Sequence, residues 1–254
     1  MSWRQWPAIT DVDEHVFELY TECGPEENQN LGYVDRSSDL VQVELADGTD
    51  LTIRQSWSEV IHNESSTGFI CWKASVNLVD WWSDGPLSQL LTADTMVVEL
   101  GAGVGGILAS QLARKCRSYV ATDQKSILKL LQANLRENGA SAQVKVAEFD
   151  WEYVEHGVYS VREVESDPID VVLASDTIYN EYLVPHFIEA AHAILRPQGV
   201  AVVAVPLRHP ELIDCFVAEA IERNRFVVRA VPSQKLSEAL RRGYVVYVME
   251  RSSS

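Results

Sequence analysis

The sequence has few of the residues that build metal sites and disulfide frameworks. Its four cysteines lie far apart and form no C-x-x-C pair, and its six histidines show no H-E-x-x-H or H-x-x-H spacing. Zinc sites and small disulfide-linked domains depend on such patterns. We therefore predict no metal centre and no disulfide framework, and we expect the cysteines to be reduced thiols.

Basic side chains are also scarce, because 21 lysines and arginines stand against 37 acidic residues and give a net charge of −16. Residues 1–67 hold 14 of the acidic side chains and only 3 basic ones. A nucleic-acid binder needs clustered lysine and arginine for its phosphate contacts, so we expect no direct nucleic-acid partner. An acidic surface suits a basic protein partner, although net charge also serves solubility in any protein.

Long apolar runs are missing as well. No run approaches the roughly 20 residues that span a bilayer, and the first 20 residues lack a basic head followed by an apolar core. We expect no membrane association and a location in the cytoplasm, with the nucleus as an alternative. The chain also lacks a G-x-S-x-G motif and a P-loop, which excludes the common hydrolase and kinase types.

The chain does contain a regular alternation of apolar strands and helical segments. With 254 residues, 46% of them hydrophobic, it is long enough for one large core and need not divide in two. We predict an α/β domain whose parallel sheet is covered by helices on both faces, with a loop containing Pro168 before its fourth strand. The predicted strands are Val97–Leu100, Tyr119–Thr122, Val144–Ala147, Ile169–Ala174, Val200–Val205, Phe226–Val231 and Tyr244–Met249.

A smaller element precedes this domain. Residues Leu40 to Ile53 alternate apolar and polar side chains around Asp47-Gly48, which predicts a β-hairpin. Trp72 to Trp82 has apolar residues at helical spacing and predicts a helix. We place an acidic N-terminal extension with a β-hairpin at residues 1–66 and the α/β domain at residues 67–251, and we expect a monomer.

The most informative segment joins a strand to a glycine-rich turn. Gly101, Gly103 and Gly106 follow the apolar run that ends at Leu100, and Glu99 stands two residues before the first glycine. Glycine lets the backbone adopt positive φ and approach a ligand closely, and the following helix directs free N–H groups toward it. This combination predicts a nucleoside pocket at the end of the strand.

Two nucleoside cofactors fit the turn. The glycines satisfy the G-x-G-x-x-G pattern of dinucleotide-binding enzymes, with Asp123 about 20 residues further on for the ribose hydroxyls. A pyrophosphate, however, is bound by the positive end of a helix, and a nearby carboxylate such as that of Glu99 opposes it. The sulfonium and ammonium groups of S-adenosylmethionine are attracted by that carboxylate. Asp123 fits either cofactor and does not discriminate between them.

The tetrad D-T-I-Y at residues 176–179 follows the predicted central strand. Ligands of parallel sheets bind beyond the carboxyl ends of the strands. If the chain turns helical at this point, Asp176 and Tyr179 share a face because they are three residues apart. Taken alone, the tetrad also fits an aspartate that caps the next helix, with a tyrosine packed beneath it. Arg208 and His209 follow the next strand, where they either border the substrate cleft or, as we expect, belong to a solvated loop.

These elements in this order, together with the segment Gly68–Trp72 and the pair Asp150-Trp151, resemble the seven-strand (class I) methyltransferases that modify protein lysines and carry a D-x-x-Y motif. The likeness extends over roughly residues 66 to 250. Within that family the chain is similar to the fungal branch that methylates a large-subunit ribosomal protein. The likeness rests on the segment Gly68–Trp72, the run Glu99–Gly105, Asp123, the pair Asp150-Trp151 and the tetrad at 176–179.

The resemblance implies a Rossmann-like sheet that closes with an antiparallel hairpin and S-adenosyl-L-methionine as cofactor. It also implies a protein lysine, in a ribosomal or other translation-related protein, as the methyl acceptor. Asp176 and Tyr179 are then the catalytic residues. The residues that the resemblance implies for cofactor binding are Trp72, Glu99, Gly101, Ala102, Gly103, Asp123, Trp151 and Ala174.

In this interpretation Asp176 anchors the incoming ammonium group of the lysine, while Tyr179 orients it and packs against the methionine end of the cofactor. Methyl transfer mainly needs aligned reactants and a neutral amine, and burial near the sulfonium lowers the pKa of the lysine. A small-molecule or arginine methyltransferase is the alternative within the class. Outside it, the sequence leaves open an NAD(P)-dependent oxidoreductase with the same type of turn and a non-catalytic methyltransferase-like interaction module.

Overall fold

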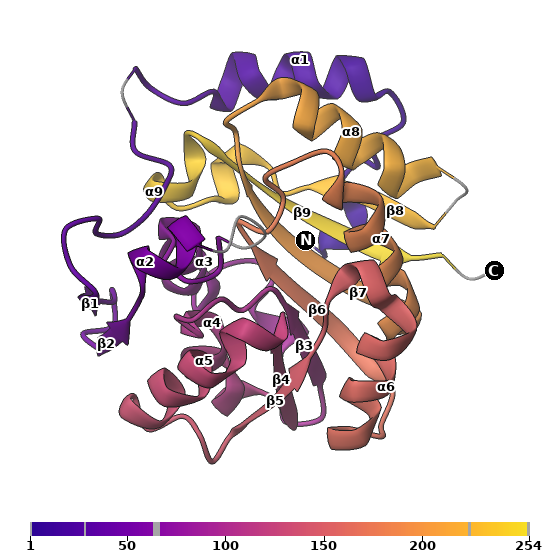
Figure 1. Ribbon diagram of the computed structural model, residues 1–254. Coiled ribbons are helices and arrows are strands. Elements are labelled where there is room, and N and C mark those ends of the chain that lie inside the picture. Colours follow the sequence, from indigo (N-terminus) through magenta and orange to yellow (C-terminus); the bar gives the residue numbers. More distant parts are fainter. Residues whose placement is uncertain (1, 28, 63–66, 223–224, 253–254) are drawn as a thin grey trace.

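A seven-stranded sheet runs through the centre of the computed structural model, which describes residues 2–27, 29–62, 67–222 and 225–252 (Figure 1). The strands of this sheet are β3 (Met96–Leu100), β4 (Ser118–Asp123), β5 (Val144–Glu148), β6 (Ile169–Ser175), β7 (Leu195–Pro206), β8 (Phe226–Ala230) and β9 (Tyr244–Arg251). Their order across the sheet is β5-β4-β3-β6-β7-β9-β8.

Parallel pairing joins the strands from β5 to β7, and β9 lies antiparallel between β7 and β8. The central parallel strands β3, β4 and β6 are buried on both faces, as the nearly continuous valine, leucine and alanine of β6 show. The predicted α/β class is confirmed, and the closing antiparallel pair has the arrangement that the family resemblance implied.

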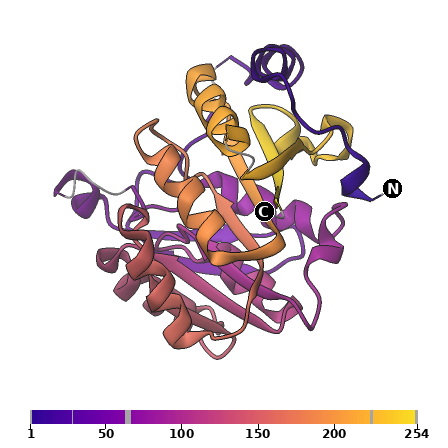
Figure 2. The same cartoon turned by 90° about the vertical axis from the view of Figure 1, so that its right-hand side faces the viewer.

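Helices form a layer on each face of the sheet (Figures 1 and 2). One layer contains α3 (Lys73–Trp82), α4 (Ile107–Leu112) and α5 (Lys125–Glu137), and the other contains α6 (Val154–Val164), α7 (Leu183–Ile194) and α8 (Pro210–Ile221). The short helices are α2 (Trp57–His62), α9 (Glu238–Arg241) and the 3₁₀ turns η1 (Trp3–Gln5), η2 (Ser88–Leu90), η3 (Ala113–Lys115), η4 (Trp151–Tyr153) and η6 (Ser233–Lys235). In the part of the chain that the structure describes, no helix has the length and apolar character needed to cross a membrane.

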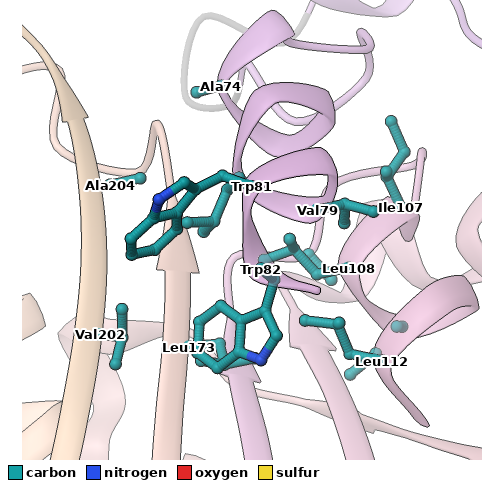
Figure 3. Packing of buried hydrophobic residues seen from close by; sticks show 14 of the residues in the cluster. Ala74, Val79, Trp81, Trp82, Ile107, Leu108, Leu112, Leu173, Val202 and Ala204 are labelled. Carbon is teal, nitrogen blue, oxygen red and sulfur yellow. The ribbon is translucent and has the colours of Figure 1, made fainter. Parts of the chain in front are cut away.

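Two adjacent tryptophans fix α3 to the sheet. Trp82 is fully buried and Trp81 almost so, and both indoles point from the helix toward sheet residues such as Leu173 (Figure 3). The indole N–H of Trp81 donates to the backbone carbonyl of Lys235 at 2.7 Å. Burying a large apolar side chain stabilises a fold by roughly 1.5–3 kcal/mol. The predicted helix is confirmed, and it begins one residue later than expected, at Lys73.

The loop expected before β6 is wrong over most of its length, because residues 154–164 form α6. Val154, Val158 and Val161 recur at helical spacing and pack against the core. A Cβ on Gly157 would lie only 1.9 Å from the ring of Phe149, so the helix packs tightly at this point. Valine has low intrinsic helix propensity, and here the tertiary packing overrides it.

A further helix, α1 (Val12–Cys23), lies in the N-terminal extension, where the sequence predicted only the hairpin. Asp11 caps it by accepting the backbone N–H of Glu14 at 2.9 Å. The helix packs against α8 and β9 (Figure 2). A ring nitrogen of His15 lies 2.9 Å from the hydroxyl of Tyr247. This part of the extension therefore lies on the face of the sheet that α6, α7 and α8 cover.

The predicted β-hairpin is confirmed. Strands β1 (Leu40–Glu44) and β2 (Asp50–Arg54) pair antiparallel, with Val43 opposite Leu51. Their apolar side chains belong to the same buried cluster as residues of the sheet. The boundary predicted between residues 66 and 67 adjoins residues 63–66, which lie outside the described residues, and it stays a prediction.

Asn134 of α5 joins the hairpin to the glycine-rich turn. Its side chain is completely buried, and its Oδ1 accepts the N–H of Arg54 at 2.9 Å. Its Nδ2 donates to the carbonyl of Arg54 at 2.8 Å and to that of Val104 at 2.7 Å. A single amide thus satisfies backbone groups of two distant segments, as buried polar groups require.

We predict that Asn134→Ala lowers the free energy of unfolding by about 2–4 kcal/mol, because it leaves the buried carbonyl of Val104 and the partly buried N–H and carbonyl of Arg54 without these partners. Urea unfolding followed by circular dichroism measures the difference. Gln132→Ala, at an exposed position of the same helix, is the matched control and should change stability by less than about 0.5 kcal/mol. Equal stability of the two variants would contradict this role of Asn134.

Candidate active site

A cavity of about 960 Å³, its open mouth included, lies where the parallel strands β3, β4 and β6 end. The glycine-rich turn, the residues just before α3, the residues that follow β5 and the D-x-x-Y tetrad form its walls. The carboxyl ends of parallel strands are the expected place for a ligand. The sequence-predicted site residues that line the cavity are Trp72, Gly101, Ala102, Gly103, Asp123, Trp151, Asp176 and Tyr179.

The glycine-rich turn takes a backbone path that requires glycine. Gly101 has a φ of 77°, and its N–H donates to the carbonyl of Thr122 at 3.0 Å. A Cβ on Gly101 would lie 2.6 Å from Cγ2 of Thr177 and 3.1 Å from the indole of Trp151, so any side chain would displace the cavity wall. Gly106 is also at positive φ, but its missing side chain makes room for Leu131 of α5.

The carboxylate of Asp123 is held at the end of β4 by the backbone. Its Oδ2 accepts the N–H of Gly103 at 2.8 Å, and its Oδ1 accepts the N–H of Gln124 at 2.8 Å. Burial raises the pKa of Asp123 to about 6 in spite of these bonds. A carboxylate has about four lone-pair sites, so two remain for ligand hydroxyl groups.

Glu99 lies behind the turn and outside the lining of the cavity. It is buried, with 2% of its surface exposed, and it accepts the hydroxyl of Tyr119 at 2.8 Å. Burial raises the pKa of Glu99 to about 8, so the group is largely protonated at neutral pH. The expectation of a carboxylate anion facing the cofactor from this position is not supported by the geometry, and a contact of Glu99 with the cofactor stays a prediction.

Ala174 is likewise absent from the lining. It is completely buried within β6, and the next residue, Ser175, contributes to the wall instead. Ser175 also hydrogen-bonds across to Ser75 of α3 at 3.4 Å. The predicted role of Ala174 in cofactor binding therefore also stays a prediction.

Two indoles stand at the cavity. Trp72 donates its N–H to the carbonyl of Thr67 at 3.1 Å. The ring of Trp151 packs edge-on against Phe187 with 5.2 Å between centroids, and its N–H has no hydrogen-bond partner among the described residues. The hydroxyl of Thr177 is also buried and has no hydrogen-bond partner within the residues that the structure describes. Buried polar atoms are usually satisfied, so such groups beside a cavity are typical of a ligand site.

The D-x-x-Y tetrad leaves β6 as an irregular turn and not as a helix, which corrects the helical geometry considered above. Asp176 has a φ of 54°, in the left-handed region that few residues other than glycine adopt. Its N–H donates to the carbonyl of Ala204 at 3.0 Å. Asp176 does not cap α7, because Asn180 accepts the N–H of Leu183, the first residue of that helix. The turn nevertheless brings Asp176 and Tyr179 to the same cavity.

An ion pair that the sequence did not predict holds Asp176. Nη1 and Nη2 of Arg208 donate to the two carboxylate oxygens at 2.7 and 2.6 Å. The side chain of Asp176 is 1% exposed, and burial raises its pKa to about 6 although Arg208 acts in the opposite direction. The available signal was the position of both residues just after the ends of adjacent parallel strands.

Tyr179 remains a neutral phenol at the cavity. Burial raises its pKa, and the neighbouring carboxylate of Asp123 adds to the shift, whereas a hydrogen bond with Thr67 opposes it. A phenol that keeps its proton can donate a hydrogen bond as well as accept one.

The charge of the lining distinguishes between the two cofactors that the turn allows. Asp123, Asp150, Glu152 and Asp176 contribute acidic side chains, and no lysine or arginine occurs among the lining residues that the structure describes. A pyrophosphate needs positive charge or free N–H groups and is repelled by carboxylates. The lining therefore fits the cationic S-adenosylmethionine better than a dinucleotide.

The fold has counterparts among solved structures. A solved structure from Streptococcus mutans, assigned to the S-adenosylmethionine-dependent methyltransferases, matches with a TM-score of 0.54 at 11% sequence identity. The match covers 86% of this chain and 57% of that one. At this identity the likeness shows the fold alone, which is the Rossmann-like methyltransferase fold.

A family model described as lysine methyltransferase matches residues 45–219. Because this span is more than half of the sequence, the chain belongs to the lysine methyltransferase family. Lysine methyltransferase is therefore the enzyme class, and S-adenosylmethionine is the cofactor that the acidic lining of the cavity fits.

Several sequence relatives are named as lysine methyltransferases, and one carries a different name. Ribosomal lysine N-methyltransferase 5 of Eremothecium gossypii is 26% identical over 82% of this chain and 87% of its own length, and that of Kluyveromyces lactis is 23% identical over 89% and 93%. A Schizosaccharomyces pombe protein named diaminohydroxyphosphoribosylamino-pyrimidine deaminase is 27% identical over 83% of this chain. This chain spans about half of that protein, 51% of its length.

We predict that Gly101→Ala weakens binding of S-adenosylhomocysteine by about tenfold or more, because the new methyl group forces Thr177 and Trp151 out of place at a φ that alanine avoids. Isothermal titration calorimetry measures the affinity. Gly48→Ala is the matched control, since Gly48 in the hairpin turn has a φ of 82° with no atom near its missing Cβ. It should lose stability by about 1 kcal/mol and bind normally. Equal losses of affinity in both variants would contradict the close approach at Gly101.

Glu99 should make stability depend on pH. Its pKa rises from 4.5 to about 8 on folding, so the native state holds a proton that the unfolded chain releases. This contribution is complete below pH 4.5 and is lost as the pH rises through 8, with a slope of up to about 1.4 kcal/mol per pH unit. Glu99→Gln keeps an acceptor for Tyr119 and does not titrate. Its free energy of unfolding, measured with urea, should therefore increase relative to that of the wild type as the pH rises from 5 to 8.

The control for this measurement is Glu137→Gln, an exposed acidic position on α5. Its stability relative to the wild type should stay constant over the same pH range. A constant difference for Glu99→Gln as well would show that Glu99 is ionised in the native protein.

Proposed function

We propose that this protein is an S-adenosylmethionine-dependent lysine N-methyltransferase that acts on a ribosomal protein in the cytoplasm. The observation that carries the proposal is the cavity at the carboxyl ends of the strands, where four acidic side chains and a D-x-x-Y tetrad meet without a basic residue among the described lining. The relatives named ribosomal lysine N-methyltransferase 5 support the class of substrate.

Several wall groups suit the parts of the cofactor. The lone pairs that remain on Asp123 would accept the ribose hydroxyls, and the backbone of Gly101–Gly103 would lie along the nucleoside. Trp151 offers a flat apolar face for the adenine, and Asp150 an acceptor for its exocyclic amine. Tyr179 would pack against the methionine end. Bound S-adenosylmethionine supplies an electrophilic methyl group on its sulfonium.

The lysine must reach this methyl group as a neutral amine. Burial and the nearby sulfonium charge both lower the pKa of an amino group. Asp176 accepts a hydrogen bond from the lysine nitrogen through the lone pairs that Arg208 leaves free, and Tyr179 orients the amine. Alignment of this kind, and not strong base catalysis, is what an in-line displacement requires.

The surface charge suits a basic substrate. Residues 1–67 carry 14 acidic and 3 basic side chains, and parts of this segment pack beside the catalytic domain. Glu152 adds acidic charge at the cavity itself. Opposite charge accelerates the encounter of two proteins, and a positively charged protein would be favoured over a nucleic acid.

Methyl transfer from radiolabelled S-adenosylmethionine into purified ribosomal proteins tests the proposal. We expect label in one protein band, recovered as methyl-lysine after hydrolysis. Asp176→Asn should lower the transfer rate by about a hundredfold, because the amide cannot hold the lysine nitrogen in the same way. Asp94→Asn removes an exposed acidic group far from the cavity and should leave the rate unchanged.

Other results would replace the proposal. Label only in small molecules would assign a different methyl acceptor. NADH binding in competition with adenosine, without S-adenosylhomocysteine binding, would favour an oxidoreductase. Tight partner binding without transfer, unaffected by Asp176→Asn, would identify a non-catalytic interaction module.

A further inference from the structure

Arg208 joins the catalytic tetrad to two other parts of the chain. Besides its two bonds to Asp176, its Nη2 donates to the backbone carbonyl of Leu31 in the N-terminal extension at 2.7 Å. Its guanidinium carbon lies 5.3 Å from the ring centre of Trp72, which is a cation–π distance. One side chain thus contacts the tetrad, the extension and the wall of the cavity.

The register of the sheet explains why these residues meet. Ser175 at the end of β6 pairs with Ala204 of β7, two residues before β7 ends at Pro206. Both strands run in the same direction, so Asp176 and Arg208 leave the sheet at the same edge. The N–H of Leu207 donates to the carbonyl of Gly243 at 2.9 Å, which fixes the chain on one side of Arg208.

The two partners differ in exposure. The side chain of Asp176 is 1% exposed and that of Arg208 is 27% exposed, so the carboxylate is buried while its guanidinium partner is partly open to solvent. A fork of two parallel N–H donors fixes a carboxylate in one orientation, which a lysine ammonium cannot do. The pair has no net charge, whereas a lone carboxylate in this position would hold an ammonium ion strongly.

We propose that Arg208 is a positioning residue for methyl transfer: it fixes the carboxylate of Asp176 in one orientation and offsets its charge, so that the substrate lysine is aligned without being trapped as an ammonium ion. This role rests on the proposed lysine methylation. Arg208 acts through Asp176 and need not contact the methyl group. The extension contributes through the carbonyl of Leu31, which holds the outer side of the guanidinium.

Other titratable groups near the pair must be separated from Asp176 in any pH experiment. Tyr244 of β9 faces Asp176, but burial raises its pKa to about 12, so it stays neutral over the useful range. Tyr179 of the tetrad is also a neutral phenol. Asp123 has a pKa of about 6, like Asp176, but it belongs to the nucleoside side of the cavity, and Arg208 is not among the groups that shift it.

The test compares Arg208→Gln, Arg208→Lys and the wild type by kcat, by KM for the methylated protein and by the pH dependence of kcat at saturating cofactor. Arg208→Gln should lower kcat by about tenfold or more, while KM for the protein stays equal or falls. In the wild type, kcat should fall as the pH drops below an apparent pKa, which lies near 6 if it belongs to Asp176. In Arg208→Gln this apparent pKa should rise by about one unit or more.

Arg208→Lys separates charge from geometry. Its kcat profile should have an apparent pKa close to that of the wild type. It should recover only part of kcat, because an ammonium cannot bridge both oxygens of Asp176. The matched control is Arg196→Gln, which breaks the pair between Arg196 and Asp170 at the opposite ends of the same two strands. This control should leave kcat and its pH profile unchanged. Binding of S-adenosylhomocysteine within about threefold of the wild type verifies that each variant is folded.

Titration of ¹³C-labelled aspartate carboxyl groups by NMR tests the pair without substrate. The Asp176 signal, assigned through Asp176→Asn, should titrate at higher pH in Arg208→Gln than in the wild type. An unchanged Asp176 titration, a lower kcat with an unchanged pH profile, or a raised KM with normal kcat would each overturn the positioning role. Absence of protein methylation by the wild type would instead show that the proposed function is wrong, whatever the NMR titration gives.

Discussion

The parallel register of β6 and β7 is the constraint on which the site depends. Because Ser175 pairs with Ala204, the two strands reach one edge of the sheet within a few residues of each other. The segments that follow them are thereby forced into contact, and Asp176 meets Arg208 across 32 positions of sequence. Strand β3, on the other side of β6, delivers the glycine-rich turn to the same edge. The chemistry of the cavity is a consequence of strand order and direction.

Burial sets the acid strength of the carboxyl groups at this edge, and the hydrogen-bond partner decides what each group does. The pKa values of Asp123 and Asp176 are raised to about 6 and that of Glu99 to about 8, in each case chiefly by burial. Asp123 is met by backbone N–H groups and Asp176 by a guanidinium, and both stay mostly ionised at neutral pH. Glu99 is met by a phenol and is largely protonated. The acids nearest the cavity thus remain available to a cationic ligand.

The N-terminal extension belongs to the architecture of the site. Asn134 ties the hairpin to the turn at Val104, and Arg208 ties Leu31 to the tetrad. The apolar side chains of the hairpin belong to the same buried cluster as those of α3, α4 and α5. The family match, which begins at residue 45, includes part of this extension.

The sequence by itself determined the strands, the turn glycines and the place of a nucleoside pocket, because continuous apolar runs and positive φ impose their requirements on single residues and short segments. It did not reveal α6, whose valines form a helix only under tertiary packing, or the protonated state of Glu99, which depends on burial. The partner of Asp176 was decided by the tertiary structure alone. Arg208 is a charged residue in a surface segment, and only the pairing of two parallel strands places it over a buried carboxylate.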